Sequence, residues 1–279
     1  MKLTLDLIHR NFTLISPEYE QFARQKDACQ SCSLYDHYKH VGQSEGNALS
    51  PSFMFVGEAL GAEEVEQGRP FIGRAGQRLR AEMRKHPATF NRLTTLISNV
   101  LPCRPPNNEY PSSSKGTAYT VTLDNEGSFF FRGKPAKPQT KKVTAPQLIQ
   151  FCCNRWLFRE IRMLRPKVLV LLGSKSLEAV RGVSGIGQHR GSWSFVDKLR
   201  VWSFATYHPS YVLRCQNDPE KEFVVEEFQQ DIAKISESWA TITAADTRLS
   251  MSDEEWSREQ ALSSGIDLKM YKEQPIGAS

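Results

Sequence analysis

The sequence predicts an α/β protein with a central four-stranded, mostly parallel sheet flanked by helices. Four short apolar runs have the length and composition of buried strands, namely Phe53–Val56, Leu96–Val100, Val168–Leu172 and Val201–Thr206. Helical patterns precede, separate or follow them, at Pro17–Gln25, Gly76–Lys85, Pro146–Leu164, Ser174–Arg181 and Glu220–Trp239. Strands that alternate with helices are typical of a parallel sheet covered on both faces.

Each strand is bounded by residues that end an extended run. The first stops at Gly57, the second leads into Pro102, the third ends at Gly173, and the fourth precedes His208-Pro209. The closing helix has one apolar side, formed by Phe223, Val224, Phe228, Ile232 and Ile235. We therefore expect it to cover the sheet.

Composition restricts the class of protein. Of 279 residues, 24% are charged and 39% hydrophobic, which is ordinary for a globular protein. No run approaches the ~18 apolar residues that a membrane span needs, and the N-terminus has no signal-peptide pattern. We therefore expect a cytoplasmic, reducing location without membrane contact, where the six cysteines are thiols or ligands and not disulfides.

Charge divides the chain unequally. The net charge is +5, but residues 241–279 carry seven acidic and four basic side chains, which leaves about +8 on the first 240 residues. We expect one domain over residues 1–240 and an acidic polar tail over 241–279, with a short helix Asp253–Leu262 begun by a Ser252–Glu255 capping box. A basic body suits a polyanion such as DNA, although charge alone favours a generic basic surface.

Residues 107–144 interrupt the alternation of strands and helices, which indicates an insertion. They are rich in Pro, Ser, Lys and Asn. A hairpin is expected in which Thr120–Leu123 pairs with Phe129–Phe131 across the turn at residues 124–128. Lysines follow the aromatic residues, so the insertion either contacts nucleic acid or is a solvated loop.

Polar residues at the strand ends suggest a binding site. Glu58 follows the first strand, Asn99 closes the second and His208 follows the fourth. Ligands of parallel sheets bind at the carboxyl ends of the strands. The same residues are also compatible with ordinary turns and strand caps.

Four cysteines could bind a metal. Cys29 and Cys32 form a C-x2-C arm, and Cys103 and Cys153 follow at a distance. Spacing alone leaves two interpretations open, a zinc site or a [4Fe–4S] cluster held by four thiolates.

Five segments, in order, resemble the iron–sulfur (family 4) branch of the uracil-DNA glycosylase superfamily. They are Cys29–Cys32, Phe53–Leu79, Ser98–Pro106, Cys153–Leu157 and Tyr207–Arg214, and the resemblance runs from about Ala28 to Ile235 with a gap at the insertion. It implies the glycosylase fold, DNA as the partner, and a [4Fe–4S] cluster on Cys29, Cys32, Cys103 and Cys153. The family ligand precedes x-x-x-Leu, which matches Cys153 and Leu157 and not Cys152.

The resemblance also implies roles for single residues. Phe71 would stack on a flipped base, Asn99 would read its edge, His208 would bond its O2, and Glu58 would face the sugar. Ala59, in the Glu58–Gly61 turn, and Glu64 would line the base site. The residues expected to contact DNA phosphates or to fill the gap left by the base are Arg190, Ser210, Tyr211 and Arg214.

The implied function is a monomeric, monofunctional glycosylase that excises uracil and leaves an abasic site. Two departures from the family pattern lie near the base site, because Leu60 replaces a proline and Val65 replaces an acidic residue. They raise the alternative of a glycosylase for a modified pyrimidine, such as a 5-substituted or glucosylated cytosine of phage DNA. A lesser alternative is a non-catalytic DNA-binding protein.

Overall fold

We analysed a computed structural model of the chain. It describes residues 10–38, 40–112, 118–123, 130–131, 134–135, 139–252 and 254–256. The chain divides into two compact units, Met1–Trp239 and Ala240–Ser279. The first contains the α/β fold and the candidate site.

A seven-stranded sheet forms the centre of the first unit, in the order β1-β2-β4-β3-β9-β11-β10. Its four inner strands are parallel and contain the four predicted runs: β4 (Thr95–Leu101), β3 (Phe53–Ala59), β9 (Val168–Leu172) and β11 (Val201–Thr206). The prediction of four strands was too low. The additional strands are β1 (Phe12–Ile15), β2 (Glu45–Ala48) and β10 (Trp193–Val196), which are short, mixed in composition and placed toward the sheet edges.

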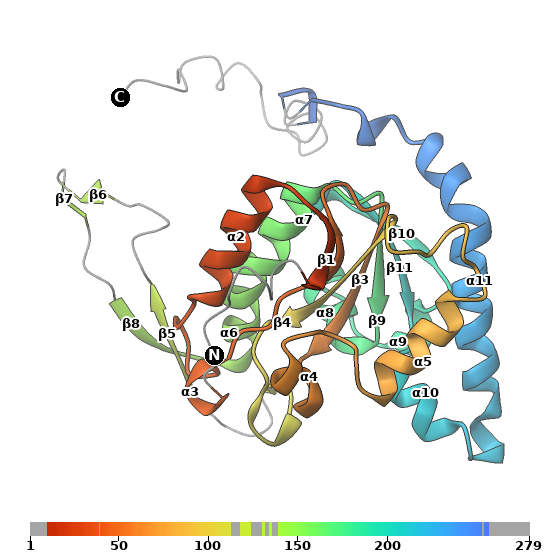
Figure 1. Cartoon of the computed structure of the whole chain (residues 1–279), viewed down its shortest axis with the longest axis horizontal. Helices are drawn as coiled ribbons and strands as arrows, with labels where there is room; N and C mark the ends of the chain where they lie inside the picture. The colour runs from red at the N-terminus through yellow and green to blue at the C-terminus, as the bar shows by residue number, and fades with distance from the viewer. Residues whose placement is uncertain are drawn as a thin grey trace. The chain divides into compact units, whose positions relative to one another are not determined.

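Helices cover both faces of the sheet, as predicted (Figure 1). Alternate residues of β3 point to opposite sides, so Met54 and Val56 belong to one hydrophobic cluster and Phe53 and Phe55 to the other. The first cluster includes α2 (Pro17–Asp27), α6 (Ala145–Cys152), α7 (Phe158–Leu164) and α8 (Ser174–Arg181). The second includes α5 (Arg74–Met83), α10 (Pro209–Cys215) and α11 (Glu222–Ala244).

The predicted helix Pro146–Leu164 is interrupted. α6 ends at Cys152, a π-helical turn η4 spans Cys153–Leu157, and α7 continues from Phe158. Short helices complete the unit: α3 (Tyr35–Tyr38), α4 (Ala62–Gln67) and α9 (Ile186–His189), with 3-10 turns at Pro106–Asn108, Asp197–Leu199 and Pro219–Lys221.

The predicted pairing within the insertion was wrong. β5 (Tyr119–Leu123) pairs antiparallel with β8 (Gln139–Val143), whereas β6 (Phe130–Phe131) pairs with β7 (Lys134–Pro135). β5 is anchored at its base, since Val121 is buried and the Thr122 N–H donates to the Ser31 carbonyl at 2.8 Å. Its partner is a polar strand that a hydrophobic pattern does not reveal. The predicted turn residues lie outside the described part of the chain.

In the second unit the predicted capping box is present. The Ser252 N–H donates to Glu255 Oε2 at 2.6 Å, and the Glu255 N–H donates to Ser252 Oγ at 3.2 Å. Helix is described at residues 254–256, and the rest of the predicted Asp253–Leu262 helix falls outside the described residues. Among those described, no helix combines the length and apolarity that crossing a membrane requires.

Candidate active site at the strand ends

The carboxyl ends of the parallel strands bring the three predicted catalytic residues to one edge of the sheet. Gly57 and Asn99 are register partners on β3 and β4, and Glu58 follows Gly57. His208 lies just beyond β11, and Gly173, just beyond β9, borders it so closely that an added Cβ would lie 2.8 Å from the His208 Cβ. Residues from all four inner strands therefore meet where the fold predicts a ligand.

Asn99 presents an acceptor without a partner. Its side chain is 8% exposed, and its Oδ1 has no hydrogen-bond partner in the described part of the chain. A Cβ on Gly57 would overlap both this oxygen and the Phe71 ring, so glycine is required for the two to approach. A buried acceptor left unsatisfied costs about 1–3 kcal/mol. A ligand that supplies a hydrogen-bond donor to this oxygen would remove the cost.

Phe71 is held in a strained conformation beside His208. Its φ is 54°, a left-handed value that bulky residues rarely adopt. The ring is buried, with its centroid 5.9 Å from that of the His208 ring. Gly76 allows close approach to the Phe71 carbonyl, which also accepts from Arg80 Nε at 3.3 Å. Backbone strain of this kind concentrates at functional sites.

The contacts of His208 determine its tautomer. The Ser210 N–H, which can only donate, points to His208 Nδ1 at 3.2 Å, and Ser210 Oγ lies 2.8 Å from the same nitrogen. Burial, and then the positive charge of Arg214, lower the pKa of His208 to about 4. The imidazole is therefore neutral at pH 7, with Nδ1 accepting and the proton on Nε2.

The Glu58 carboxyl interacts electrostatically with two cations. Burial raises the pKa of its carboxyl, and the charges of Lys175 and Arg214 oppose that rise. Tyr110 is also close, since Glu58 helps to raise the pKa of its phenol, and the Tyr110 hydroxyl is buried with no hydrogen-bond partner among the described residues. Sequence reasoning did not select Lys175 or Tyr110. Lys175 follows Gly173 by two residues, so the strand-end argument could have found it.

Ala59 and Glu64 lie on either side of the turn that follows β3. Ala59 ends β3 and pairs with Leu101. Glu64 Oε2 accepts the Gly61 N–H at 2.5 Å. Burial raises the pKa of Glu64, and N–H groups of Gly61, Phe71 and Ile72 oppose that rise. Its carboxylate thus joins the turn after β3 to the Phe71 loop, and its contact with a base stays a prediction.

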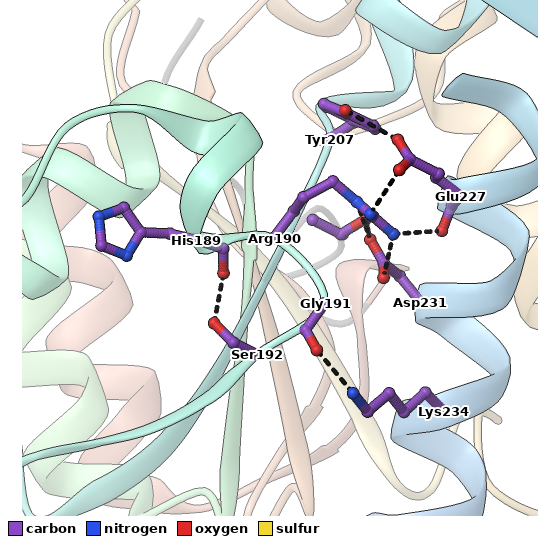
Figure 2. Close-up of polar contacts among 9 residues, drawn as sticks. His189, Arg190, Gly191, Ser192, Tyr207, Glu227, Asp231 and Lys234 are labelled. Atoms are coloured by element: carbon purple, nitrogen blue, oxygen red, sulfur yellow. Dashed lines mark hydrogen bonds and ion pairs between the residues drawn. The ribbon is translucent and has the colours of Figure 1, made fainter. Parts of the chain in front are cut away.

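The Arg190 guanidinium forms ion pairs with two carboxylates (Figure 2). Its guanidinium is 15% exposed and lies 2.6 Å from Asp231 Oδ1 and 2.9 Å from Glu227 Oε1. Asp231 also accepts from Thr206 Oγ1 at 2.7 Å, and Glu227 from the Tyr207 hydroxyl at 2.9 Å. Arg190 therefore fastens its loop, and the end of β11 before His208, to α11. This arrangement favours a structural role over the predicted DNA contact.

The other residues predicted to contact DNA lie on α10. Ser210 bonds His208 as described above. The Tyr211 ring centroid is 5.4 Å from that of Tyr207, and the exposed Arg214 guanidinium lies 5.7 Å from the centroid of the Tyr211 ring. The charge of Arg214 acts on both Glu58 and His208, so Arg214 borders the site, and Tyr211 lies next to it.

Several thiols are gathered at the base of the insertion. Cys32 and Cys152 are hydrogen-bonded, and Cys103 interacts electrostatically with Cys29 and Cys32. Cys153, the predicted fourth ligand, interacts electrostatically with Cys152 and with Lys198. Within the described residues no group of three or more His, Cys, Asp or Glu side chains is arranged to hold a metal ion.

Sequence comparisons agree with this architecture. Residues 43–232 match the family described as the uracil DNA glycosylase superfamily. The type-4 uracil-DNA glycosylase of Thermotoga maritima is 30% identical over 207 residues, covering 72% of this chain and 86% of the relative. The corresponding protein of Sulfurisphaera tokodaii is 29% identical over 226 residues, covering 78% and 83%. That of Pyrobaculum aerophilum is 29% identical over 212 residues, covering 74% and 86%.

Proposed function

This chain belongs to the uracil DNA glycosylase superfamily, and we propose that it excises uracil from DNA by hydrolysing the N-glycosidic bond, which leaves an abasic site. One observation carries the proposal above the others. The buried Oδ1 of Asn99 has no partner among the described residues and lies beside Gly57, as does the Phe71 ring, so it can accept from a planar ligand that has an N–H donor.

Uracil offers the matching groups. Its N3–H can donate to Asn99 Oδ1, and its O4 can accept from the Asn99 amide. Cytosine has an acceptor at N3 and a donor at N4, so the same amide would oppose both. Phe71 supplies an apolar ring against which the base can stack. Because the glycosidic bond is inaccessible inside a duplex, the nucleotide must be flipped into this site.

The remaining residues have roles in bond cleavage. The bond between C1′ and N1 breaks with its electron pair moving to the base, and negative charge grows at O2. Neutral His208 donates its Nε2–H there, and a fixed donor aimed at developing charge is a large catalytic term. Glu58 stabilises the cationic sugar and orients the water that attacks C1′. Lys175 and Arg214 favour the charged form of Glu58.

We further propose a [4Fe–4S] cofactor bound by Cys29, Cys32, Cys103 and Cys153. Its contribution when bound is structural. The ligands come from the loop after α2, the segment after β4 and the end of α6, so the cluster would tie these segments together. The main-chain bridge between Cys32 and Val121 joins the insertion to the same region.

Packing explains why Leu60 stands where the family pattern has a proline. Its side chain is buried, and it borders Gly42 so closely that a Cβ there would overlap it. Leu60 therefore fills space against the loop before β2, and the structure does not connect it with a larger base. A monomer in a reducing cytoplasm stays a prediction.

The proposal is tested with an oligonucleotide that contains one uracil. Incubation with the protein, followed by alkali, should cut the strand at that position, whereas strands with thymine or cytosine there should stay intact. A monofunctional enzyme should give no cleavage before alkali. Full-length uracil strands after prolonged incubation with folded, iron-loaded protein would contradict the proposal.

A further inference from the structure

The turn that carries Phe71 depends on its surroundings for its shape. The left-handed φ of 54° is unfavourable for a bulky residue, and such a conformation persists only where neighbouring groups enforce it. The ring is nevertheless buried, with its centroid 5.9 Å from that of the His208 ring. The groups that hold the backbone of this turn therefore determine where the ring lies.

Helix α5 supplies the first of these groups. Gly76 and Arg80 are four residues apart on α5 and so share one of its faces. A Cβ on Gly76 would overlap the Phe71 carbonyl, so glycine lets the turn lie against the helix. One helical turn later, the Arg80 guanidinium donates from Nε to the Phe71 carbonyl at 3.3 Å and from Nη2 to the Pro70 carbonyl at 3.4 Å. One side chain thus holds two successive carbonyls.

Glu45, on the neighbouring strand β2, holds the guanidinium in turn. Its carboxylate is 8% exposed, and its Oε2 lies 3.2 Å from Arg80 Nη2. The same carboxylate accepts from Arg69 Nη2 at 2.9 Å and from Arg69 Nε at 3.2 Å. Because Arg69 directly precedes Pro70, the carboxylate is linked to the turn twice, once through each arginine. Charge-assisted hydrogen bonds of this kind are stronger than those between neutral groups.

We propose that Glu45 and Arg80 are positioning residues for the glycosylase reaction, an inference that rests on the proposed function. They hold the Phe71 backbone in its left-handed conformation and so keep the ring where a flipped base would stack. A ring that is in place before the base arrives does not have to be ordered during binding. The effect on the reaction passes through Phe71, because the bonds from Arg80 reach the backbone of this turn.

The first test measures the turn itself, without DNA. Hydrogen exchange followed by mass spectrometry compares residues 69–74 in the full-length wild type, Arg80→Met, Glu45→Gln and Arg84→Met. Arg84 is exposed at the end of α5, so its variant is a control that removes the same charge from the same helix. Exchange in this segment should rise at least about tenfold in Arg80→Met and Glu45→Gln, and should match wild type in Arg84→Met. Equal exchange in all four proteins would overturn the proposal.

A double-mutant cycle tests whether Arg80 acts on the reaction through Phe71. Phe71→Leu removes the aromatic ring and keeps an apolar side chain. Arg80→Met should slow single-turnover uracil release, at saturating protein, by about tenfold or more in the wild-type background. In the Phe71→Leu background it should slow release by less than about twofold, because no ring remains to be positioned. Equal losses in the two backgrounds would overturn the positioning role.

The two measurements separate this inference from the proposed function. Circular dichroism shows that each variant is folded. If Arg80→Met does not fold, Arg80→Lys takes its place, since lysine keeps the charge and lacks the planar fork of donors. Wild-type protein that releases no uracil would contradict the proposed function, whereas hydrogen exchange would still decide whether Glu45 and Arg80 hold the Phe71 turn.

Discussion

In the proposed function, Asn99 is the residue on which base recognition depends. Its amide is buried and its Oδ1 is unpaired in the described part of the chain. Asn99→Ala should reduce single-turnover uracil release by roughly 100-fold or more, because the contacts to N3–H and O4 are lost, while the urea unfolding midpoint stays close to wild type. The exposed Asn217→Ala is the control. A rate within twofold of wild type in Asn99→Ala would remove Asn99 from the site.

His208 should make stability depend on pH. Its pKa is lowered from 6.5 to about 4 in the fold, so the unfolded chain binds more protons between these values. The stability that neutral His208 contributes is complete above pH 6.5 and is lost as pH falls toward 4, by about 3 kcal/mol. Urea unfolding should show a steeper loss for wild type than for His208→Ala over this range. Equal losses would contradict the assigned protonation state.

Gly57 makes the contact between Asn99 and Phe71 sterically possible. Gly57→Ala would insert a methyl group between them and should lower uracil release strongly, with a smaller effect on folding. Gly187→Ala, where an added Cβ meets nothing within 4 Å, should leave release unchanged. Wild-type release by Gly57→Ala would show that the base does not occupy this position.

At the scale of elements, the strands β3, β4, β9 and β11 could be predicted because burial on both faces leaves continuous apolar runs. The outer strands β1 and β10 and the second strand β2 could not, since they are short and mixed. Strand ends identified Glu58, Asn99 and His208. Arg190 was assigned to DNA because sequence does not show its partner Asp231, which is 41 residues away. The π-helical turn η4 could not be predicted, because the pattern Cys-x-x-x-Leu also fits an uninterrupted α-helix.

The Arg190 contact should stabilise the fold. Arg190→Ala leaves the buried Asp231 without its ion pair, so the free energy of unfolding should fall by about 3 kcal/mol. The salt dependence of DNA affinity should keep its slope, because no phosphate contact is lost. Urea titration and binding at several salt concentrations measure both quantities. Unchanged stability with a shallower salt slope would restore the predicted DNA contact.

At the scale of the whole molecule, the proposed cluster would join segments that are far apart in the chain. Cys103→Ser should therefore lose iron and lower the thermal unfolding temperature, because the loop after α2 and the end of α6 are no longer linked through the segment after β4. Iron analysis and calorimetry measure this. Normal iron content in Cys103→Ser would contradict its assignment as a ligand.

The central claim is that one site, built from four strand ends, selects uracil. Mass spectrometry of free bases tests it most directly, with the iron-loaded protein and DNA panels containing uracil, hypoxanthine, and 5-substituted and glucosylated cytosines. We predict that uracil is the main product and that Asn99→Ala abolishes it. Release of a bulky modified base with little uracil, or no release from any strand, would contradict the account.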